Sequence, residues 1–411
     1  MFSLDNNNEN ELEETAPKSA GTAPLGTIAK SSPTSSNLQQ SEGQKLRSKR
    51  YKLLKKARAL FINAGLSEGL DIPTKYHRTS LCKHACTGSA GVGINLLVEA
   101  KKGFYTGLQT CGSVWTCPVC ANKIQEVRRL EIASAMKYFY HQKKQAVMIT
   151  ITFPHNKKQS LAELLSKFSE ALKMFRKGGA WSRKMKSFGY EGLIRSLEVM
   201  HGANGWHPHN HELWFLDEEI DHLEFQEFIN NKWLEVCIKA GLVDSEDIEK
   251  QDHLLDHGID IKFNCSTSEY LAKFDDGKHW GVDREMAKSS NKKSQKNGSH
   301  PFALLDENKD SLFLEYAEAI KGKAQIYWSQ GLKKKVGILE ITDEEAAEKE
   351  ADDLPVFVGL LSKLTWDKVT SKELRAEVLD LTESKKTIEE IRSFIFENSK
   401  MNDHTPVRLK C

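Results

Sequence analysis

Apolar and polar residues alternate along four short stretches of the chain, and a period of two indicates a β-strand. The clearest stretch begins at Ala146 and is ended by Pro154. Glycine and asparagine between His201 and Gly205 supply residues that let a chain reverse. We therefore expect two antiparallel strands joined by a turn within residues 193–216. The predicted strands cover residues 146–153, 193–200, 209–216 and 258–263.

Other stretches place apolar residues three or four positions apart, which is the period of an amphipathic helix. One of them begins at Gln44, and Ala64-Gly65 ends it. Another begins near Ser266 or Thr267, either of which can cap a helix. Strands with helices between them predict an α+β protein, in which helices cover one face of an antiparallel sheet. Further helices are predicted at residues 122–141, 159–178 and 217–240, from residue 310, and within 366–400.

Composition divides the chain into segments. Residues 1–43 are rich in Asn, Ser, Thr, Glu and Gln and lack periodic apolar residues, so we expect a disordered tail. The expected order is this tail, a basic helical segment (44–76), a cysteine-rich segment (77–121), a main α+β domain (122–340), an acidic linker (341–365) and a small helical C-terminal appendage (366–411).

The net charge of +2 conceals an uneven distribution. Residues 45–58 carry eight lysines and arginines and no acid, which is compatible with nucleic-acid binding and equally with a solvated helix face. No apolar run approaches the ~18 residues of a membrane span, and the polar start does not resemble a signal peptide. We therefore expect a cytoplasmic protein with no membrane partner, whose cysteines are not paired in disulfides.

Five cysteines are grouped between residues 82 and 120, where Cys117-Pro-Val-Cys120 has the spacing of a zinc-binding turn. An upstream pair can complete a tetrahedral site for a structural Zn²⁺. The favoured ligands are Cys82, Cys86, Cys117 and Cys120, with Cys111 as the first substitute and His84 as another option. The alternative is a set of reduced, half-buried thiols.

Three histidines, His207, His209 and His211, stand at alternate positions of the return strand and therefore point to one face. Neutral imidazoles are common metal ligands, and Glu198 on the partner strand can add a carboxylate. The pattern predicts a metal site on the face of the sheet, held by His209, His211 and Glu198. Because Pro208 interrupts the strand, we expect His207 to matter less. The alternative is three histidines without a metal.

As a set, these motifs resemble the HUH endonucleases, the rolling-circle replication initiators of small plasmids and single-stranded DNA phages, and most of all the plasmid Rep proteins. The resemblance extends from Arg78 to Gly337. It rests on His-Pro-His-Asn-His followed by Glu-Leu-Trp-Phe at 207–215, Cys-Pro-Val-Cys at 117–120, Ile-Thr-Ile-Thr-Phe-Pro-His at 149–155 and Tyr-Leu-Ala-Lys at 270–273. It implies an HUH-like core within residues 122–340 that nicks and rejoins one DNA strand.

The resemblance also implies roles for residues. Tyr270 would attack the DNA to give a 5′-phosphotyrosine, Lys273 would assist it, and the histidine site would hold Mg²⁺ or Mn²⁺. The implied partners are plasmid DNA, first as a double-strand origin and then as a single strand, and a host helicase and polymerase. The sequence leaves both a monomer and an oligomer open. A Lys/Ser/Asn/Gly-rich loop suits phosphate contact through Lys288, Lys292, Lys293 and Lys296.

One position departs from the family pattern. Related initiators often carry two polar groups four residues apart on the active-site helix, whereas this chain has Tyr270 and Phe274. Termination would then need Glu269 to activate water, or the Tyr270 of a second protomer. Three other functions remain open: an HUH-type single-strand DNA transposase, a non-catalytic zinc-dependent DNA-binding protein, and a histidine-metal phosphodiesterase in which water attacks.

Overall fold

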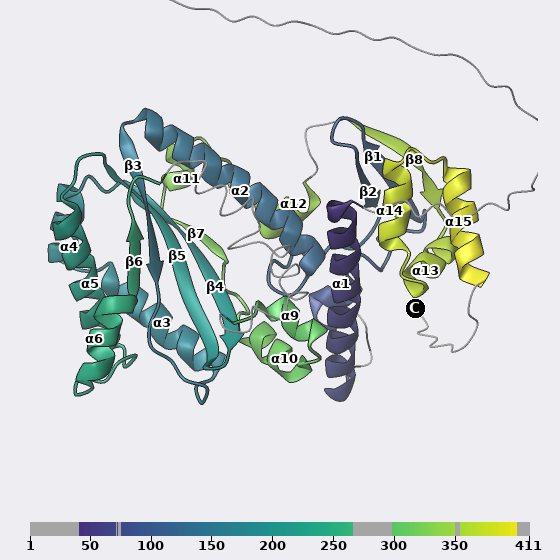
Figure 1. Cartoon of the computed structure of the whole chain (residues 1–411). Helices are drawn as coiled ribbons and strands as arrows, with labels where there is room; N and C mark the ends of the chain where they lie inside the picture. Colours follow the sequence, from purple (N-terminus) through teal and green to yellow (C-terminus); the bar gives the residue numbers. More distant parts are fainter. Residues whose placement is uncertain (1–40, 71, 73–74, 266–297, 350–353, 401–411) are drawn as a thin grey trace, which may run out of the picture. The chain divides into compact units, whose positions relative to one another are not determined.

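The computed structural model describes residues 41–400 except for 71, 73–74, 266–297 and 350–353. Helices and antiparallel strands make up this part of the chain (Figure 1), which confirms the α+β class. Most of the expected disordered tail, residues 1–43, lies outside the described residues. Among the described helices, none combines the length with the apolar character that a bilayer span requires.

Within the described residues, the larger sheet has five antiparallel strands in the order β6-β3-β5-β4-β7. Four of them are the expected strands, and β7 is an additional edge strand. A turn at Ala203-Asn204 joins β4 to β5. Gly205 has a φ of 85°, and a Cβ there would lie 2.8 Å from the Cα of Lys157, so this position requires glycine. The strands are β3 (Lys144–Ile151), β4 (Gly192–Gly202), β5 (Gly205–Asp217), β6 (Ile259–Lys262) and β7 (Ile326–Trp328).

Strand β5 begins earlier than the sequence predicted, and Pro208 lies inside it. Pro208 pairs with Val199 of β4. On its other side β5 pairs with β3 only as far as Asn210, so the missing N–H of Pro208 interrupts no ladder there. His207 is therefore part of the strand, and the expected interruption at Pro208 is wrong.

Helices cover both faces of the larger sheet, whereas the sequence predicted helices on one face. On the first face, Met148, Leu213 and Phe215 pack beneath helix α2, and Phe139 of α2 stacks on Phe215 with ring centroids 4.0 Å apart. On the second face, helices α3 and α5 cover the alternate strand residues, including Trp214. The four consecutive apolar residues 213–216 are typical of a strand that is buried on both faces.

Helix α2 (Pro118–His141) joins the cysteine-rich segment to the larger sheet. The Cys117 side chain caps its N-terminus by accepting the backbone N–H of Cys120, and Pro118 takes the first position, where no N–H is needed. Its first turns pack in the same core as helix α1, and its later turns cover the sheet. The other helices that the structure describes in the main domain are α3 (Leu161–Phe175), α4 (Gly179–Ser187), α5 (His222–Lys239), α6 (Ile248–His257), α9 (Pro301–Asp306), α10 (Asp310–Ala319) and α11 (Leu332–Lys335).

A smaller sheet pairs segments from the two ends of the described chain. Among the described residues its order is β2-β1-β8, with β1 (Val92–Leu97), β2 (Lys102–Thr106) and β8 (Pro355–Leu361) all antiparallel. The structure here differs from the acidic linker expected at 341–365, because that range contains helix α12 (Asp343–Glu348) and β8. Arg128 of α2 binds Asp343 at 2.9 Å, which fixes α12 on the main domain. The appendage helices are α13 (Lys363–Ser371), α14 (Arg375–Glu383) and α15 (Ile388–Lys400).

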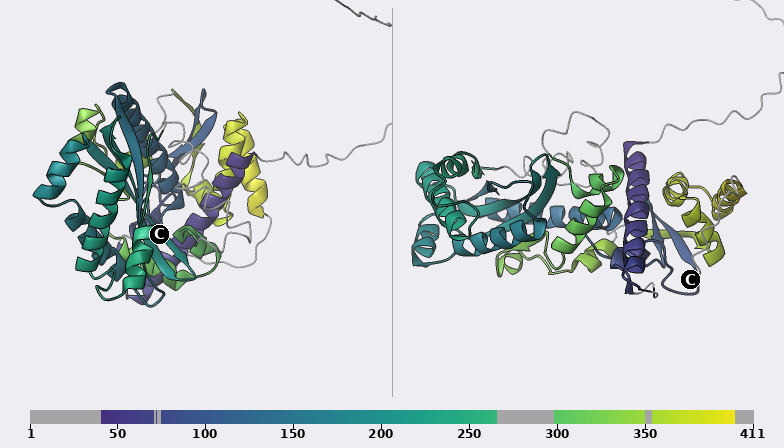
Figure 2. Two further views of the ribbon diagram at one scale, coloured as in Figure 1. Left: turned by 60° about the vertical axis from the view of Figure 1, so that its left-hand side comes forward. Right: turned by 90° about the horizontal axis from the view of Figure 1, so that it is seen from below.

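Helix α1 (Glu42–Ser67), the basic segment, packs against α14 (Figures 1 and 2). Arg47 forms ion pairs with Asp380 and Glu383 of α14, and Arg58 donates to the carbonyl oxygen of Ser80 across 2.7 Å. Many of its basic side chains are thus bound within the chain, a role that the composition alone did not indicate. Further ion pairs join Lys55 to Glu373, and Lys49 and Lys56 to Asp306. A short 3₁₀ helix, η2 (Arg78–Leu81), follows α1.

Candidate functional site

The register of β4 and β5 brings Glu198, His209 and His211 to one point of the larger sheet. Glu198 lies directly opposite His209, and His211 is the next residue on the same face. The Nε2 atoms of His209 and His211 lie 3.0 Å and 3.3 Å from the same oxygen, Oε2 of Glu198. One ligand atom from each residue lies within 4.8 Å of the other two. The three residues that the sequence predicted as metal ligands therefore converge.

Both imidazole rings are also held through their Nδ1 atoms. The Nδ1–H of His209 donates to the carbonyl oxygen of His207 across 3.3 Å, and Nδ1 of His211 lies 3.0 Å from the hydroxyl oxygen of Thr150. A partner on one ring nitrogen fixes the orientation of the ring and leaves the other nitrogen for a ligand. From the sequence, Thr150 was expected only as part of the strand at residues 146–153. Its place on β3, directly opposite His211, is the feature that gives it this additional contact.

The electrostatics of this group favour a charged carboxylate. Burial opposes the charge on Glu198, but the two imidazoles outweigh it and hold the pKa of Glu198 well below its usual range. Burial also opposes the charge on His209, and Glu198 nevertheless raises the pKa of that imidazole. The side chains of His209, Glu198 and His211 are 11%, 15% and 16% exposed, so solvent still reaches them.

This donor set fits a divalent metal ion. A carboxylate oxygen and two Nε2 atoms already face one another, and their rings are oriented by neighbouring groups. Imidazole and carboxylate ligands suit Mn²⁺ and other first-row metals, and carboxylate ligands also suit Mg²⁺.

His207 shares the face of this group, but its ring bonds elsewhere. Its Nδ1 lies 2.7 Å from Nε2 of His155, the last residue of the Ile-Thr-Phe-Pro-His motif. Burial, together with His209 and His155, lowers the pKa of His207 to about 3. His155 had no predicted role. The structure shows that its ring lies against His207, with centroids 4.8 Å apart.

The acid within the histidine motif, Glu212, points to the opposite face of the sheet. Its side chain is fully buried, pairs with Arg176 and accepts the indole N–H of Trp214 across 2.9 Å. A buried carboxylate that is bound in this way contributes to the packing of the second face and lies outside the metal group.

The residues expected to act directly on DNA lie outside the described residues. These are Tyr270, Lys273 and the loop lysines Lys288, Lys292, Lys293 and Lys296. The described chain stops at Cys265, which is in the apolar cluster of Met148 and Leu213 on the first face. It resumes at Gly298, and Ser299 pairs with His201 of β4 through two backbone hydrogen bonds. Both flanks of this segment are therefore attached to the larger sheet.

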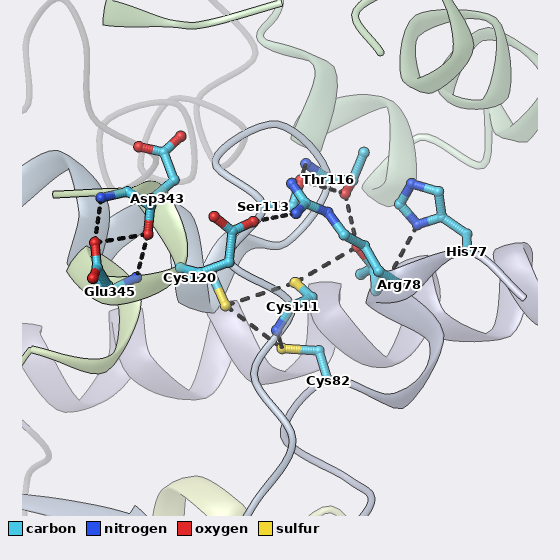
Figure 3. A network of polar contacts seen from close by, with 12 residues as sticks. His77, Arg78, Cys82, Cys111, Ser113, Thr116, Cys120, Asp343 and Glu345 are labelled. Carbon is cyan, nitrogen blue, oxygen red and sulfur yellow. Dashed lines mark hydrogen bonds and ion pairs between the residues drawn. The ribbon is translucent and has the colours of Figure 1, made fainter. Parts of the chain in front are cut away.

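A second group of potential ligands lies at the start of α2. The sulfur atom of Cys82 lies 3.6 Å from that of Cys117 and 3.5 Å from that of Cys120, and the sulfur atoms of Cys111 and Cys120 lie 3.7 Å apart. Figure 3 shows the side chains of Cys82, Cys111 and Cys120 directed toward one another. These distances are too long for disulfides. They match a tetrahedral zinc site, in which Zn–S bonds of ~2.3 Å place the sulfurs ~3.8 Å apart.

This cysteine group differs from the expected ligand set at one position. Cys111, which the sequence analysis ranked as the substitute, joins the group, and neither Cys86 nor His84 belongs to it within the described chain. Cys86 instead forms a β-bridge with Leu108. Cys111 follows this bridge and lies beside Cys82, whose sulfur atom accepts the backbone N–H of Cys111. Hydrogen bonds from Cys111, Cys117 and Cys82 hold the pKa of Cys120 well below its usual range, as suits a thiolate ligand.

A comparison with known protein families gives a match that covers more than half of the chain. Residues 105–356 match the model of a family described as "Replication protein". This span includes the β4–β5 hairpin, Cys111, Cys117 and Cys120, and excludes Cys82.

Two curated relatives are similar to the chain. "Protein rep" of Streptomyces lividans is 25% identical over 367 residues, which cover 68% of this chain and 76% of that protein. "Neomycin resistance protein" of Streptomyces cyanogenus is 30% identical over 132 residues, which cover 26% of this chain and 30% of that protein. No solved structure matches with significance.

Proposed function

The chain belongs to the replication protein family, and from this premise we propose that it initiates the rolling-circle replication of a plasmid by nicking and later rejoining one DNA strand. The observation that carries this proposal is the convergence of His209 and His211 on one oxygen of Glu198, on two adjacent inner strands of a five-stranded antiparallel sheet. A replication initiator that opens a strand needs a divalent ion beside the scissile phosphate, and these residues offer the ligands.

Glu198, His209 and His211 would hold Mg²⁺ or Mn²⁺, and the two imidazoles favour Mn²⁺. When bound, the ion supplies charge that polarises a non-bridging phosphate oxygen. The contribution of the chain is orientation: Thr150 and the carbonyl of His207 hold the two rings so that both Nε2 atoms face the carboxylate. Such outer contacts determine how firmly a metal site is preorganised.

Tyr270 is the proposed nucleophile. Its phenolic oxygen attacks phosphorus and the bond to the 3′ oxygen breaks, which leaves a 5′-phosphotyrosine and a 3′-hydroxyl that takes up a proton and that a host polymerase can extend. Tyr270 stands five positions after Cys265, which is in the first-face cluster, and an extended chain spans at most ~3.5 Å per residue, so connectivity limits the distance between their Cα atoms to ~18 Å. Lys273 would help to deprotonate the phenol, whose ordinary pKa is ~10.

Rejoining follows as the reverse of cleavage. The 3′-hydroxyl attacks the phosphotyrosine, the phosphodiester forms again, and Tyr270 leaves with a proton. This step needs no second nucleophile, in agreement with Phe274 at the position where related initiators often carry another polar group. To clear a finished round, either Glu269 activates water or a second protomer supplies its Tyr270. Lys288, Lys292, Lys293 and Lys296 would hold the strand, and a host helicase would open the duplex.

The test uses a supercoiled plasmid that carries the cognate origin. Wild-type protein with Mn²⁺ should convert it to the nicked form, EDTA should prevent this, and His209→Ala and Glu198→Gln should abolish it. His207→Ala should retain most of the activity, because the ring that it removes bonds to His155 and not to Glu198. Nicking that survives both EDTA and His209→Ala would overturn the proposal. A nicked product without protein attached to it would instead favour a phosphodiesterase that uses water.

A further inference from the structure

A cleft of about 320 Å³ lies outside the larger sheet, where four segments of the chain meet. Its walls are the first turns of α1 and α2, the β1–β2 hairpin and the end of α14. None of its lining residues belongs to the histidine group, so it is separate from the proposed nicking site.

The lining of this cleft is strongly basic. Among the described residues it includes one acid, Glu383, and six cationic side chains: Arg47, Arg50, Lys83, Lys101, Lys102 and Lys123. Arg47 pairs with both Glu383 and Asp380 of α14, and Glu383 also accepts the backbone N–H of Gly103 across 2.9 Å. Lys101 and Lys102 are exposed in the β1–β2 turn, where an approaching anion can meet them.

The backbone adds to this positive potential. Helices α1 and α2 both have their N-terminal turns in the wall, through Gly43 and Gln44 in one and Val119 and Asn122 in the other. The N-terminus of a helix carries a partial positive charge and favours anions. The positive ends of the two helices therefore add to the charge of the lysines and arginines in the cleft wall.

The same walls offer little surface to a nucleobase. Tyr51, Phe104 and Tyr105 line the cleft but are only 8%, 9% and 9% exposed, and the hydroxyl of Tyr105 donates to the carbonyl of Arg375 across 2.8 Å. Proteins that bind single strands without sequence preference stack bases on exposed aromatic rings, which this cleft lacks among its described residues. Its chemistry fits phosphate groups rather than bases.

We propose that this cleft binds backbone phosphates of duplex DNA and so positions the origin while the histidine site acts on one strand. The inference rests on the proposed function, because it assigns the duplex partner of the same protein to a second surface. A cleft of this volume is too small to hold base pairs. The duplex would therefore lie across its rim, and phosphates of one strand would bind in the cleft. Binding here should be independent of sequence and should weaken as salt rises.

The test measures binding of the full-length protein to a fluorescent duplex of arbitrary sequence, in EDTA, across a series of salt concentrations. The variant is Lys101→Ala/Lys102→Ala. Each phosphate contact contributes ~0.9 to the slope of log affinity against log salt, so the slope should fall by about two and the affinity at 0.1 M salt by roughly 60-fold. The matched control is Lys137→Ala/Lys143→Ala, which removes two exposed lysines near the far end of α2, ~20–30 Å along the helix from Lys123.

Unchanged binding by the control, with equal melting temperatures for all three proteins, would support the assignment. Wild-type affinity and slope in Lys101→Ala/Lys102→Ala would overturn it, as would saturable binding of inorganic phosphate or a mononucleotide in the cleft without any effect on duplex binding. Because EDTA prevents cleavage, the readout does not depend on nicking. Protein that binds duplex through these lysines but never nicks DNA would refute the proposed function and leave the cleft assignment standing.

Discussion

Glu198 and His209 face each other across the central hairpin of the larger sheet, with 3.0 Å between a carboxylate oxygen and Nε2. The pairing is direct, because the two residues are register partners on β4 and β5. The carboxylate of Glu198 thus lies beside the imidazole of His209 and raises its pKa. His211 belongs to the same group. A divalent ion can take the place of the proton on the ring and satisfy the same carboxylate.

Removal of either member of this pair should weaken metal binding. His209→Ala and Glu198→Gln each remove a proposed ligand, so Mn²⁺ affinity should fall by more than the ~10–100-fold that the loss of an outer contact costs. Isothermal titration with Mn²⁺ measures this. His207→Ala serves as the control, since its Nδ1 is directed to His155. An equal loss for His207→Ala would show that the ligand pair is His207 and His209.

Thr150 should influence the metal through His211. Thr150→Val keeps the shape of the side chain but removes the hydroxyl that lies 3.0 Å from Nδ1, so the ring loses its orienting partner. We expect Mn²⁺ affinity to fall ~10–100-fold and Thr150→Ser to restore most of it. Equal affinity in Thr150→Val and wild type would show that the hydroxyl does not orient the ring.

Much of this site could be predicted from the sequence because its signals are local. Alternation in β5 places His209 and His211 on one face, and a short turn forces β4 to return beside it with Glu198. The contact of Thr150 could not be predicted, since it depends on the register of β3 against β5, which no turn determines. The pairing of β1 with β8 is more remote still, because the segment between them contains the whole main domain.

The cysteine group gives a prediction that separates two ligand sets. Cys111→Ser should reduce bound zinc to well below one per chain and lower the melting temperature, because the free energy of zinc binding becomes free energy of folding. Cys86→Ser should do neither. Metal analysis and thermal melts of both variants decide between them. Loss of zinc in Cys86→Ser alone would restore the set that spacing favoured.

That spacing could not identify Cys111 for a physical reason. The interval between Cys82 and Cys86 resembles a ligand pair, but the fold uses these residues to start a β-bridge between Cys86 and Leu108. The chain reverses between Cys86 and Leu108, through the β1–β2 hairpin, and this reversal brings Cys111 back to Cys82. The number of residues between two cysteines does not show whether a reversal of the chain brings their sulfur atoms together.

Alkaline pH should destabilise the protein through Tyr51. Burial raises the pKa of this phenol to about 12 from an ordinary value of ~10, so the folded state keeps a proton that the unfolded state loses. The free energy of unfolding should therefore fall as pH rises from 10 to 12, by roughly 2–3 kcal/mol from this group. Denaturant unfolding of wild type and Tyr51→Phe across this range should show a shallower decline in the variant. If the free energy of unfolding fell equally with pH in wild type and Tyr51→Phe, Tyr51 would not be the source of the decline.

In the proposed reaction, strand cleavage links the chain covalently to DNA through Tyr270. The most direct measurement is mass spectrometry of tryptic peptides after incubation with an origin oligonucleotide and Mn²⁺. A nucleotide should be attached to the peptide that contains Tyr270, and Tyr270→Phe should form no adduct although it still binds the oligonucleotide. Cleavage without an adduct, or an adduct on a different residue that persists in Tyr270→Phe, would contradict it.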